Sequence, residues 1–444
     1  MKALVRGYLS AMGNEQCALW LACAVFIHAG CRKDKDTSAP VVQILSPSEG
    51  FNVFVPDTIT VRVAVEDDHI VEGLTLLIAD DDGVPITTPV AVPIGARSAT
   101  VDVDLPLISE RIVDGNYVLT ALATDGANNG RALQWITVHA APLRLRSIYV
   151  APPAGLAGPL TITRIDSVGQ RSTFIVLNEI GGTAIDPDHL FLTGTQYDPL
   201  VRFAIPSGTN SALLANPGTA SPSTPYFTSL SVDPTDGRLY CATRDGFVRG
   251  FHPSGGQSFT ANSPPGSFCE AAVVVGDELV TTTINTVTQE RRLVSHTYNS
   301  GALLAQFPSD VQVTKLFAID DQHVLILGNR DGGGVIELVN TQQGGVFEMR
   351  TFPGDPMLSA AQVGPGTYVV GMTSGLVRFN YQSNSVTTLI GGTAFSALAY
   401  EPISGGVWGG AGTELRLIDP QNGTASEQLV LSNAVGAILL HYNR

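Results

Sequence analysis

From about residue 41 onward, the chain consists of short segments of apolar or alternating residues that are separated by polar turns. Residues 58–65 alternate between apolar and polar side chains with period two, which is typical of a strand with one buried face. Clusters of Asp, Asn, Ser, Pro and Gly separate the segments, and these residue types favour turns. No segment after the first thirty residues has sustained helical periodicity. The pattern predicts an all-β protein.

Residues 39–140 contain a first group of such segments, at 41–45, 58–66, 74–79, 100–105, 117–124 and 133–138. Polar turns at 80–83 and 125–130 separate several of them. About seven short strands within about a hundred residues is typical of an immunoglobulin-like (Ig-like) β-sandwich. We therefore expect a first domain of this class at 39–140.

From about residue 144 the chain repeats a unit of four short strands. The second strand of each unit is the clearest, and these segments lie at 148–150, 190–192, 239–241, 279–281, 324–326, 368–370 and 407–409. Their central residues are 39 to 49 positions apart. A period in the forties with about four strands per unit is typical of the blades of a β-propeller.

The two ends of this region complement each other. The first unit begins at a second strand, Ile148, with no inner strand before it, whereas residues 434–440 resemble an inner strand with nothing after them. Pairing these segments would complete a seventh blade and leave no open edge. The sequence therefore predicts a seven-bladed propeller at 144–444, closed by the C-terminal strand, with six or eight blades as alternatives.

The composition narrows the function classes. Only 15% of the residues are charged, and the net charge is −15. Nucleic-acid binding requires clustered Lys and Arg, which are absent from this sequence, so we expect no nucleic-acid partner. The 46 Gly and 27 Pro residues agree with a turn-rich all-β protein.

The first thirty residues have the features of a signal peptide. Lys2 and Arg6 precede a short apolar stretch at 17–27, and Ala29-Gly30-Cys31 follows directly. The ending resembles the lipobox of bacterial lipoproteins, although His28 replaces the usual aliphatic residue. The resemblance implies lipidation of Cys31 and a membrane anchor, with 31–38 as a tether. The alternative is an ordinary cleaved signal in which the cysteine is coincidental.

Three further resemblances concern location and domains. The Lys/Asp-rich segment 32–36 is similar to the surface-export signal of Bacteroidota lipoproteins, which implies a surface-exposed outer-membrane lipoprotein of the cell envelope. Residues 115–129 resemble the late strands of bacterial Ig-like modules, which implies a spacer. The pieces 233–240 and 415–423 resemble repeats of YVTN-type and WD40-like propellers, although neither a WD40 nor a kelch signature is present.

One cation site is conceivable in the first domain. Glu66, Asp67 and Asp68 end one predicted strand, and Asp125 and Asn128 follow another. If the two loops share one pole, Glu66, Asp68, Asp125 and Asn128 could ligate Ca²⁺. The alternative is that they are ordinary turn residues, and no other cofactor is expected.

Two cysteines remain in the propeller region, Cys241 and Cys269. They fall on different predicted blades and could pair in an oxidising compartment. The interpretation we favour is two buried thiols.

The propeller loops contain the residues that we predict to bind a ligand. Loops between second and third strands, and between consecutive blades, emerge on one face. They contain the aromatic and charged residues Tyr197, Asp198, Tyr226, Arg244, Asp245, Arg330 and Asp331. Aromatic rings beside hydrogen-bonding groups suit sugars or peptides. The alternative is that Arg-Asp-Gly is simply a β-turn with a solvated ion pair.

Two functions follow from these patterns. The first is a non-enzymatic envelope protein whose propeller is a binding or scaffold platform for a glycan, peptide or protein. The alternative is an exported propeller hydrolase or lyase that acts on a polysaccharide or a small ester. No nucleophile-elbow, zinc-protease or phosphate-loop motif is present. Asp186, Asp320, Asp321 and Glu401 follow inner strands, where we interpret them as turn residues.

Overall fold

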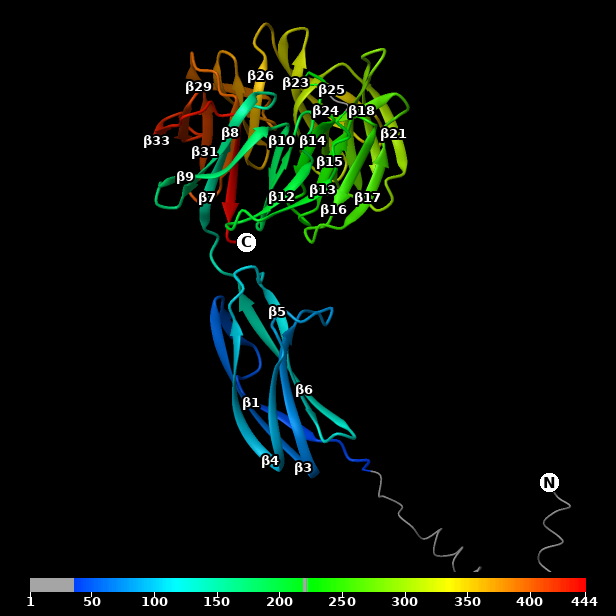
Figure 1. Ribbon diagram of the computed structural model, residues 1–444, viewed down its shortest axis with the longest axis vertical. Coiled ribbons are helices and arrows are strands. Elements are labelled where there is room, and N and C mark those ends of the chain that lie inside the picture. Colours follow the sequence, from blue (N-terminus) through cyan, green and yellow to red (C-terminus); the bar gives the residue numbers. More distant parts are fainter. Residues whose placement is uncertain (1–35, 219–220, 222) are drawn as a thin grey trace, which may run out of the picture. The chain divides into compact units, whose positions relative to one another are not determined.

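The computed structural model describes residues 36–218, 221 and 223–444, so the predicted signal peptide and Cys31 lie outside the described residues. The chain divides into two compact units, Met1–Pro142 and Leu143–Arg444. In both units the regular elements of the described residues are all β-strands (Figure 1). No helix among these residues has the length and apolar character needed to cross a membrane.

The first unit contains a six-stranded sheet in the order β1-β3-β5-β6-β2, with β4 paired to β3. Strand β2 runs parallel to β6, and the other pairs are antiparallel. The strands are β1 (Val41–Ser46), β2 (Phe51–Phe54), β3 (Asp57–Ala79), β4 (Val90–Leu107), β5 (Gly115–Thr124) and β6 (Asn129–His139). Their inward side chains form one hydrophobic core, which includes Leu76, Leu105, Leu119 and Ile136.

Strand β3 joins two segments that the sequence predicts as separate strands. Its first half pairs with β1, its second half pairs with β5, and β4 follows it along both halves. Buried positions alternate through Val61, Val63 and Val65, and the alternation moves by one residue between Val71 and Leu74. The register with β4 shifts at the same place, between Val71 and Gly73. This bulge turns both halves toward the same core.

The described part of the second unit contains seven four-stranded antiparallel sheets (Figure 1). The sheet at the seam consists of β34 (Ala437–Tyr442), β7 (Leu145–Ala151), β8 (Ala157–Asp166) and β9 (Arg171–Glu179). The next three consist of β10 (Gly182–Ile185), β11 (His189–Thr193), β12 (Leu200–Ala204) and β13 (Asn210–Leu214); β14 (Phe227–Val232), β15 (Leu239–Thr243), β16 (Phe247–Phe251) and β17 (Gln257–Asn262); and β18 (Ser267–Val275), β19 (Glu278–Asn285), β20 (Arg291–Thr297) and β21 (Leu303–Ser309).

The other three sheets follow the same order along the chain. They consist of β22 (Gln312–Ala318), β23 (His323–Arg330), β24 (Gly333–Asn340) and β25 (Val346–Phe352); β26 (Met357–Gly364), β27 (Thr367–Met372), β28 (Gly375–Asn380) and β29 (Ser385–Gly391); and β30 (Ala397–Glu401), β31 (Gly406–Ala411), β32 (Glu414–Ile418) and β33 (Ala425–Val430).

The first strands of these sheets form a closed ring. Strand β10 contacts β14, and the contacts continue through β18, β22, β26 and β30 to β34, which contacts β10 again. Strand β34 pairs antiparallel with β7, so that Ile438 lies opposite Val150 and Leu440 opposite Ile148. A ring of four-stranded sheets that meet through their first strands is the architecture of a β-propeller.

Burial follows the position of each strand within its sheet. The second strands, such as β15 and β27, are almost wholly buried because neighbouring sheets cover both of their faces. The fourth strands, such as β13 and β33, are mostly exposed or half-buried. The predicted second strands are therefore the clearest signal because they are apolar on both faces.

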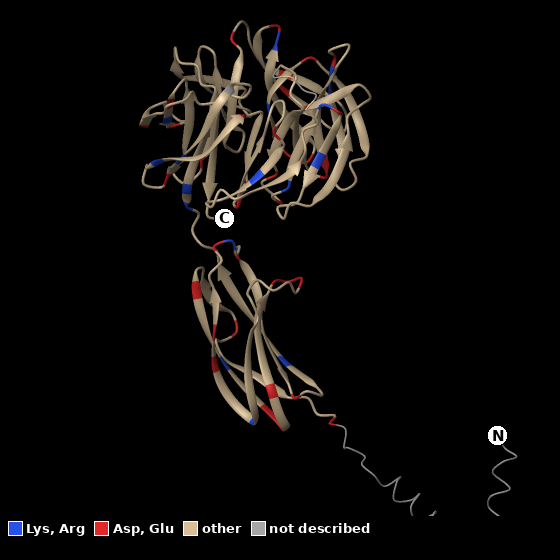
Figure 2. Cartoon of the chain, in the orientation of Figure 1, with Lys and Arg blue, Asp and Glu red and all other residues tan. Residues whose placement is uncertain are grey.

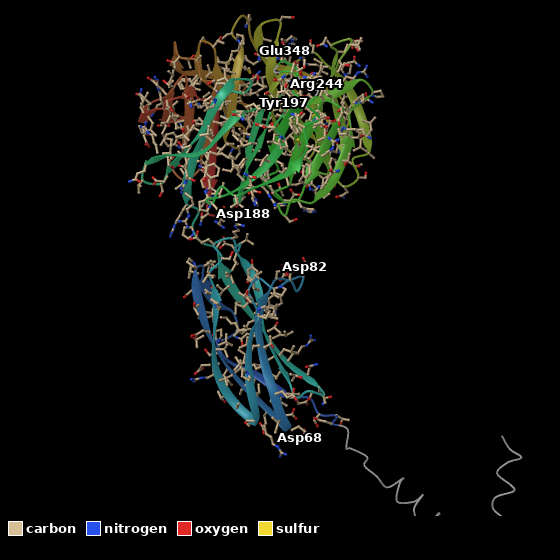
Figure 3. The ribbon with its side chains drawn as sticks, viewed as in Figure 1. Asp68, Asp82, Asp188, Tyr197, Arg244 and Glu348 are labelled. Carbon is tan, nitrogen blue, oxygen red and sulfur yellow. The ribbon has the colours of Figure 1, made fainter. Side chains whose placement is uncertain are left out.

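The propeller has two faces, which we name by their loops. The upper face contains the loops that join second to third strands and one sheet to the next, including the loops of Tyr197 and Arg244. The lower face contains the hairpin turns that join first to second strands and third to fourth strands, including the turn at Asp188. Figure 3 shows Tyr197, Arg244 and Glu348 at one end of this unit and Asp188 at the other. Basic and acidic residues are scattered along the strands and loops of the unit (Figure 2).

Candidate functional site

The residues that we predict to bind a ligand lie on the upper face of the propeller. Tyr197 and Asp198 lie between β11 and β12, and Arg244 and Asp245 lie between β15 and β16. Arg330 ends β23, and Tyr226 directly precedes β14. Equivalent loops of three sheets therefore supply these side chains.

The Tyr197 loop is held by a carboxylate from the neighbouring sheet. Glu179, at the end of β9, accepts hydrogen bonds from Thr195 Oγ1 at 2.5 Å and from the Gln196 N–H at 2.7 Å. Its other oxygen accepts the N–H groups of Tyr197 at 2.6 Å and Asp198 at 2.5 Å. Burial alone would raise the pKa of Glu179, but these four hydrogen bonds lower it to about 2. The Tyr197 residue itself is 69% exposed, so a fixed backbone presents a free aromatic ring.

Asp245 organises the second loop. It accepts a hydrogen bond of 3.0 Å from the Tyr226 hydroxyl, and its ion pair is with Arg249 at 3.2 Å. Arg244 instead donates from Nε to the Pro225 carbonyl at 3.0 Å, and its guanidinium lies 4.3 Å from the centre of the Phe268 ring. Tyr226 and Asp245 are thus brought together, whereas Arg244 packs against the next sheet.

Arg330 is held in a cluster of acidic residues. Its guanidinium contacts Asp310 at 3.0 Å and Glu337 at 2.8 Å, and it also contacts Glu348. Glu337 is only 4% exposed, and burial raises its pKa although the adjacent Arg330 opposes this shift. Asp331 has a φ of 51°, in the left-handed turn that follows β23. These contacts give Arg330 a structural role within its own sheet.

The described interactions do not join the three loops to one another. Each loop is braced by its own sheet or by the adjacent one, and each borders a different part of the surface. A hollow of about 250 Å³ is lined by Leu156, Glu179 and residues 195–198 of the Tyr197 loop. A second hollow of about 460 Å³ is lined by residues 289–292 and 308–310. The upper face is therefore a set of rigid loops with shallow hollows.

The two acidic loops of the first unit do lie at one pole. Burial and hydrogen bonds shared with Asp68 and Asp125 raise the pKa of Asp67. The Asn128 amide nitrogen donates to Asp125 at 3.2 Å, and Glu66 is exposed to solvent. Asp67 therefore interacts with both Asp68 and Asp125, and Asn128 is held by Asp125. The strand pattern could not reveal this because the alternation is interrupted near this point.

The two cysteines of the propeller are free thiols. Cys241 in β15 and Cys269 in β18 are both buried. Burial raises the pKa of Cys241 to about 12 and raises that of Cys269 as well. Both are therefore protonated and unreactive at neutral pH.

The carboxylates that follow first strands have a repeated structural role. Asp186 accepts the N–H groups of Asp188 and His189, both at 2.6 Å. Asp320 and Glu401 bind the backbone of their own hairpins in the same way. In three equivalent turns the carboxylate binds the backbone of its own turn, so these are structural turn residues, as we interpret them from the sequence.

Two features of the propeller are absent from our sequence-based predictions. Lys315 in β22 is the only lysine of the described residues, and it lies in the ring of first strands. Its side chain is reached by solvent but surrounded by protein, which lowers its pKa. The second feature is a hollow of about 560 Å³ on the lower face, where Tyr368, Tyr381 and Tyr400 meet. Its residues come from separate repeats, so no local motif marks it.

Among known proteins, the chain is similar to solved structures only. No family model and no curated protein matches the chain. The chain is similar to the crystal structure of BamB from Moraxella catarrhalis, with 15% identity over 57% of this chain and 76% of that one and a TM-score of 0.40. It is also similar to a quinonprotein alcohol dehydrogenase-like protein from Bacteroides thetaiotaomicron, with 13% identity over 91% and 99% of the two chains and a TM-score of 0.45.

A third similar structure is that of a mitotic checkpoint complex, with 13% identity over 58% of this chain and 80% of that one and a TM-score of 0.47. At these identities and scores the likenesses carry no argument about activity. The assignment of a β-propeller rests on the four-stranded sheets and on the closed ring of their first strands.

Proposed function

We propose that this chain is a non-enzymatic lipoprotein of the bacterial cell envelope whose seven-bladed propeller is a binding or scaffold platform. The first unit is an Ig-like sandwich that acts as a spacer between the anchor and the propeller. The anchor is a lipid on Cys31, which follows Ala29-Gly30 after an apolar segment. The location is the outer membrane, with the chain exposed at the surface.

The observation that carries the platform proposal is the way Glu179 holds the Tyr197 loop. Four hydrogen bonds from one carboxylate fix the loop backbone, while the Tyr197 ring stays exposed. Binding residues are commonly found on loops that a rigid scaffold positions. A fixed aromatic ring also loses little conformational entropy when it binds a partner.

The ligand of the upper face is a glycan, a peptide or a protein. Tyrosine is enriched where proteins contact each other, and its flat ring also packs on sugars. The alternative function, an exported hydrolase or lyase acting on a polysaccharide or small ester, needs converging acids near the channel. Asp186, Asp320 and Glu401 are occupied in hairpins instead, which favours binding over catalysis.

A glycan array and a peptide library, probed with the full chain, would test the platform. We expect Tyr197→Ser to lower binding at the upper face, because it removes the exposed ring without touching the Glu179 hydrogen bonds. Val168→Ser is the matched control, since Val168 is 77% exposed in the β8–β9 turn of the lower face. Equal loss of binding in both variants, or no loss in Tyr197→Ser, would contradict the proposal.

Fatty-acid labelling of cells tests the anchor separately. We expect the wild type to be labelled and Cys31→Ser to be unlabelled. Equal labelling of both would show that Cys31 is not the lipid attachment site. Because this assay does not depend on ligand binding, the anchor and the platform can fail independently.

A further inference from the structure

The lower face of the propeller contains a pocket of about 560 Å³ that three neighbouring sheets build together. Tyr368 in β27, Gln362 in β26 and Tyr381 after β28 come from one sheet, and Tyr400 in β30 comes from the next. The preceding sheet contributes Ile319, which follows β22. This volume is in the range of small-ligand sites, roughly 300–1,000 Å³.

The hydroxyl of Tyr368 is the most informative group in this pocket. Tyr368 is 0% exposed, and its hydroxyl has no hydrogen-bond partner among the described residues. Its ring packs between Phe317 at 4.9 Å and Phe379 at 6.3 Å, centre to centre. A buried polar group without a partner is costly, and a ligand group that reaches this hydroxyl from the pocket would relieve that cost. Burial raises the pKa of Tyr368 to about 12, so the group stays a neutral O–H.

Another second-strand tyrosine, Tyr240, is arranged differently. Tyr240 in β15 packs against Leu279 of the following sheet, whereas Tyr368 in β27 packs against Leu325 of the preceding sheet. The Tyr240 hydroxyl accepts a hydrogen bond from Arg238 at 3.4 Å. The Arg238 guanidinium lies 4.8 Å from the centre of the Tyr298 ring. Of these two tyrosines, only Tyr368 has an unpartnered hydroxyl and also lines an open pocket. The hydroxyls of Tyr149 and Tyr442 are also buried without a partner in the described part of the chain, so the Tyr368 hydroxyl distinguishes this pocket only together with the lining around it.

The remaining lining selects the class of ligand. The pocket is lined by aromatic rings, by the amides of Gln362 and Gln382, and by Gly and Pro, with no charged residue. The chain as a whole has a net charge of −15, so an uncharged pocket is a local feature. Ionic ligands would find no counter-charge there. Aromatic rings with neutral hydroxyl and amide groups match a ligand with apolar C–H faces and many hydroxyls.

We propose that this pocket binds a neutral carbohydrate, with one or two sugar rings of a glycan seated among Tyr368, Tyr381 and Tyr400. The C–H face of a sugar ring packs on the exposed side of Tyr381 or Tyr400. The sugar hydroxyls exchange hydrogen bonds with the Tyr368 O–H and with the amides of Gln362 and Gln382. The proposal deepens the proposed binding function by assigning a ligand class to a second, separate face.

The neighbouring backbone offers a way to fill the pocket without changing the tyrosines. Gly364, at the end of β26, lines the pocket, and a Cβ added there would meet nothing within 4 Å. Its φ is not in the left-handed region, so a side chain causes no backbone strain. Gly364→Leu therefore places bulk in open space at the pocket.

The test is calorimetric titration of the purified full chain with neutral oligosaccharides chosen from a glycan array. We expect Tyr368→Phe, which removes only the hydroxyl, to weaken binding by about tenfold. Gly364→Leu should abolish binding. The matched control Tyr240→Phe should leave the affinity unchanged, since its hydroxyl already has a partner. Circular dichroism and thermal melting confirm that each variant is folded.

Several outcomes would overturn the proposal. One is the absence of binding by every neutral glycan at millimolar concentration. Others are an affinity that neither Tyr368→Phe nor Gly364→Leu changes, and exclusive binding of polyproline peptides, which also dock on aromatic grooves. Tyr197→Ser separates this site from the upper face: it should leave carbohydrate binding at the pocket intact. Loss of binding in Tyr197→Ser alone would support the upper-face platform and refute this pocket.

Discussion

The backbone N–H of Arg144 donates a 2.8 Å hydrogen bond to Oδ1 of Asn443, which is 299 residues away in the sequence. The Asn443 N–H in turn donates to the Arg144 carbonyl at 3.2 Å. These bonds extend the pairing of β34 with β7 and join the two ends of the propeller. Gly436, which directly precedes β34, lets the chain pass close to Pro153, because a Cβ at this position would lie 2.3 Å from that residue. The ring is therefore closed by main-chain contacts between distant segments.

Deletion of residues 434–444 should abolish cooperative unfolding of the propeller. The deletion removes β34 and exposes an edge of β7 together with the apolar side chains that β34 covers. We expect low solubility and loss of the propeller transition in scanning calorimetry. Asn443→Ala is the milder control, since it removes one hydrogen bond and should cost about 1 kcal/mol. A truncated chain that melts like the wild type would contradict closure by β34.

Arg330→Met should destabilise the propeller by about 3–5 kcal/mol, because it leaves the buried Glu337 carboxylate without its counter-charge. The double variant Arg330→Met/Glu337→Met should recover most of the loss in urea unfolding. A cost below about 1 kcal/mol for the single variant would show that the ion pair behaves as an exposed one. That outcome would favour the predicted ligand-binding role of Arg330 on the upper face.

Acid should selectively weaken the contribution of Glu179. Its folded pKa of about 2 lies below the usual value of 4.5, so its stabilising effect is complete above pH 4.5 and is lost as the pH falls toward 2. We expect Glu179→Gln to be less stable than the wild type at pH 7 by about 1–2 kcal/mol. The difference should shrink between pH 4.5 and 2, measured by urea unfolding at each pH. A difference that is constant with pH would contradict the assigned role of the carboxylate.

Calcium at about 1 mM should raise the melting temperature of the first unit if Asp67, Asp68 and Asp125 ligate the ion. Because calcium binds ionised carboxylates, the effect should be lost in acid, and the raised pKa of Asp67 moves this loss to a higher pH than for an ordinary aspartate. Asp67→Asn should remove the shift, whereas Asp104→Asn, on an exposed strand position, should keep it. The absence of both a thermal shift and a calorimetric signal in the wild type would exclude a calcium site here.

Lys315→Met should increase stability at pH 7. Although solvent reaches Lys315, the protein around it partly desolvates the ammonium and lowers its pKa below 10.5, so the unfolded chain binds more protons than the folded chain in this range. The stability of the wild type should therefore rise with pH, and the advantage of the variant should fade as the pH approaches 10.5. Urea unfolding between pH 7 and 10 measures both trends. A variant that is less stable than the wild type at pH 7 would indicate a bound anion or an acidic partner for Lys315.

The sequence by itself determined the local structure of this protein. Period-two alternation placed the strands of the first unit, and continuous apolar segments placed the second strands of the propeller. Both patterns are local, because the side chains of a strand reflect which of its faces are buried. The missing first strand before Ile148 and the unpaired segment after Ala434 also predicted the pairing of β34 with β7. Such predictions succeed because backbone hydrogen bonds at a sheet edge must be satisfied.

The tertiary structure alone decided which side chains meet. Two predicted strands became the single strand β3, since a bulge between Val71 and Gly73 keeps both halves on one core. Arg330 was predicted on a ligand-binding loop, but Asp310, Glu337 and Glu348 surround it in space. The Tyr368 pocket combines residues of three sheets, which no spacing in the chain relates. Contacts between sheets depend on packing across the ring, and a pattern read along one strand contains no information about its neighbours.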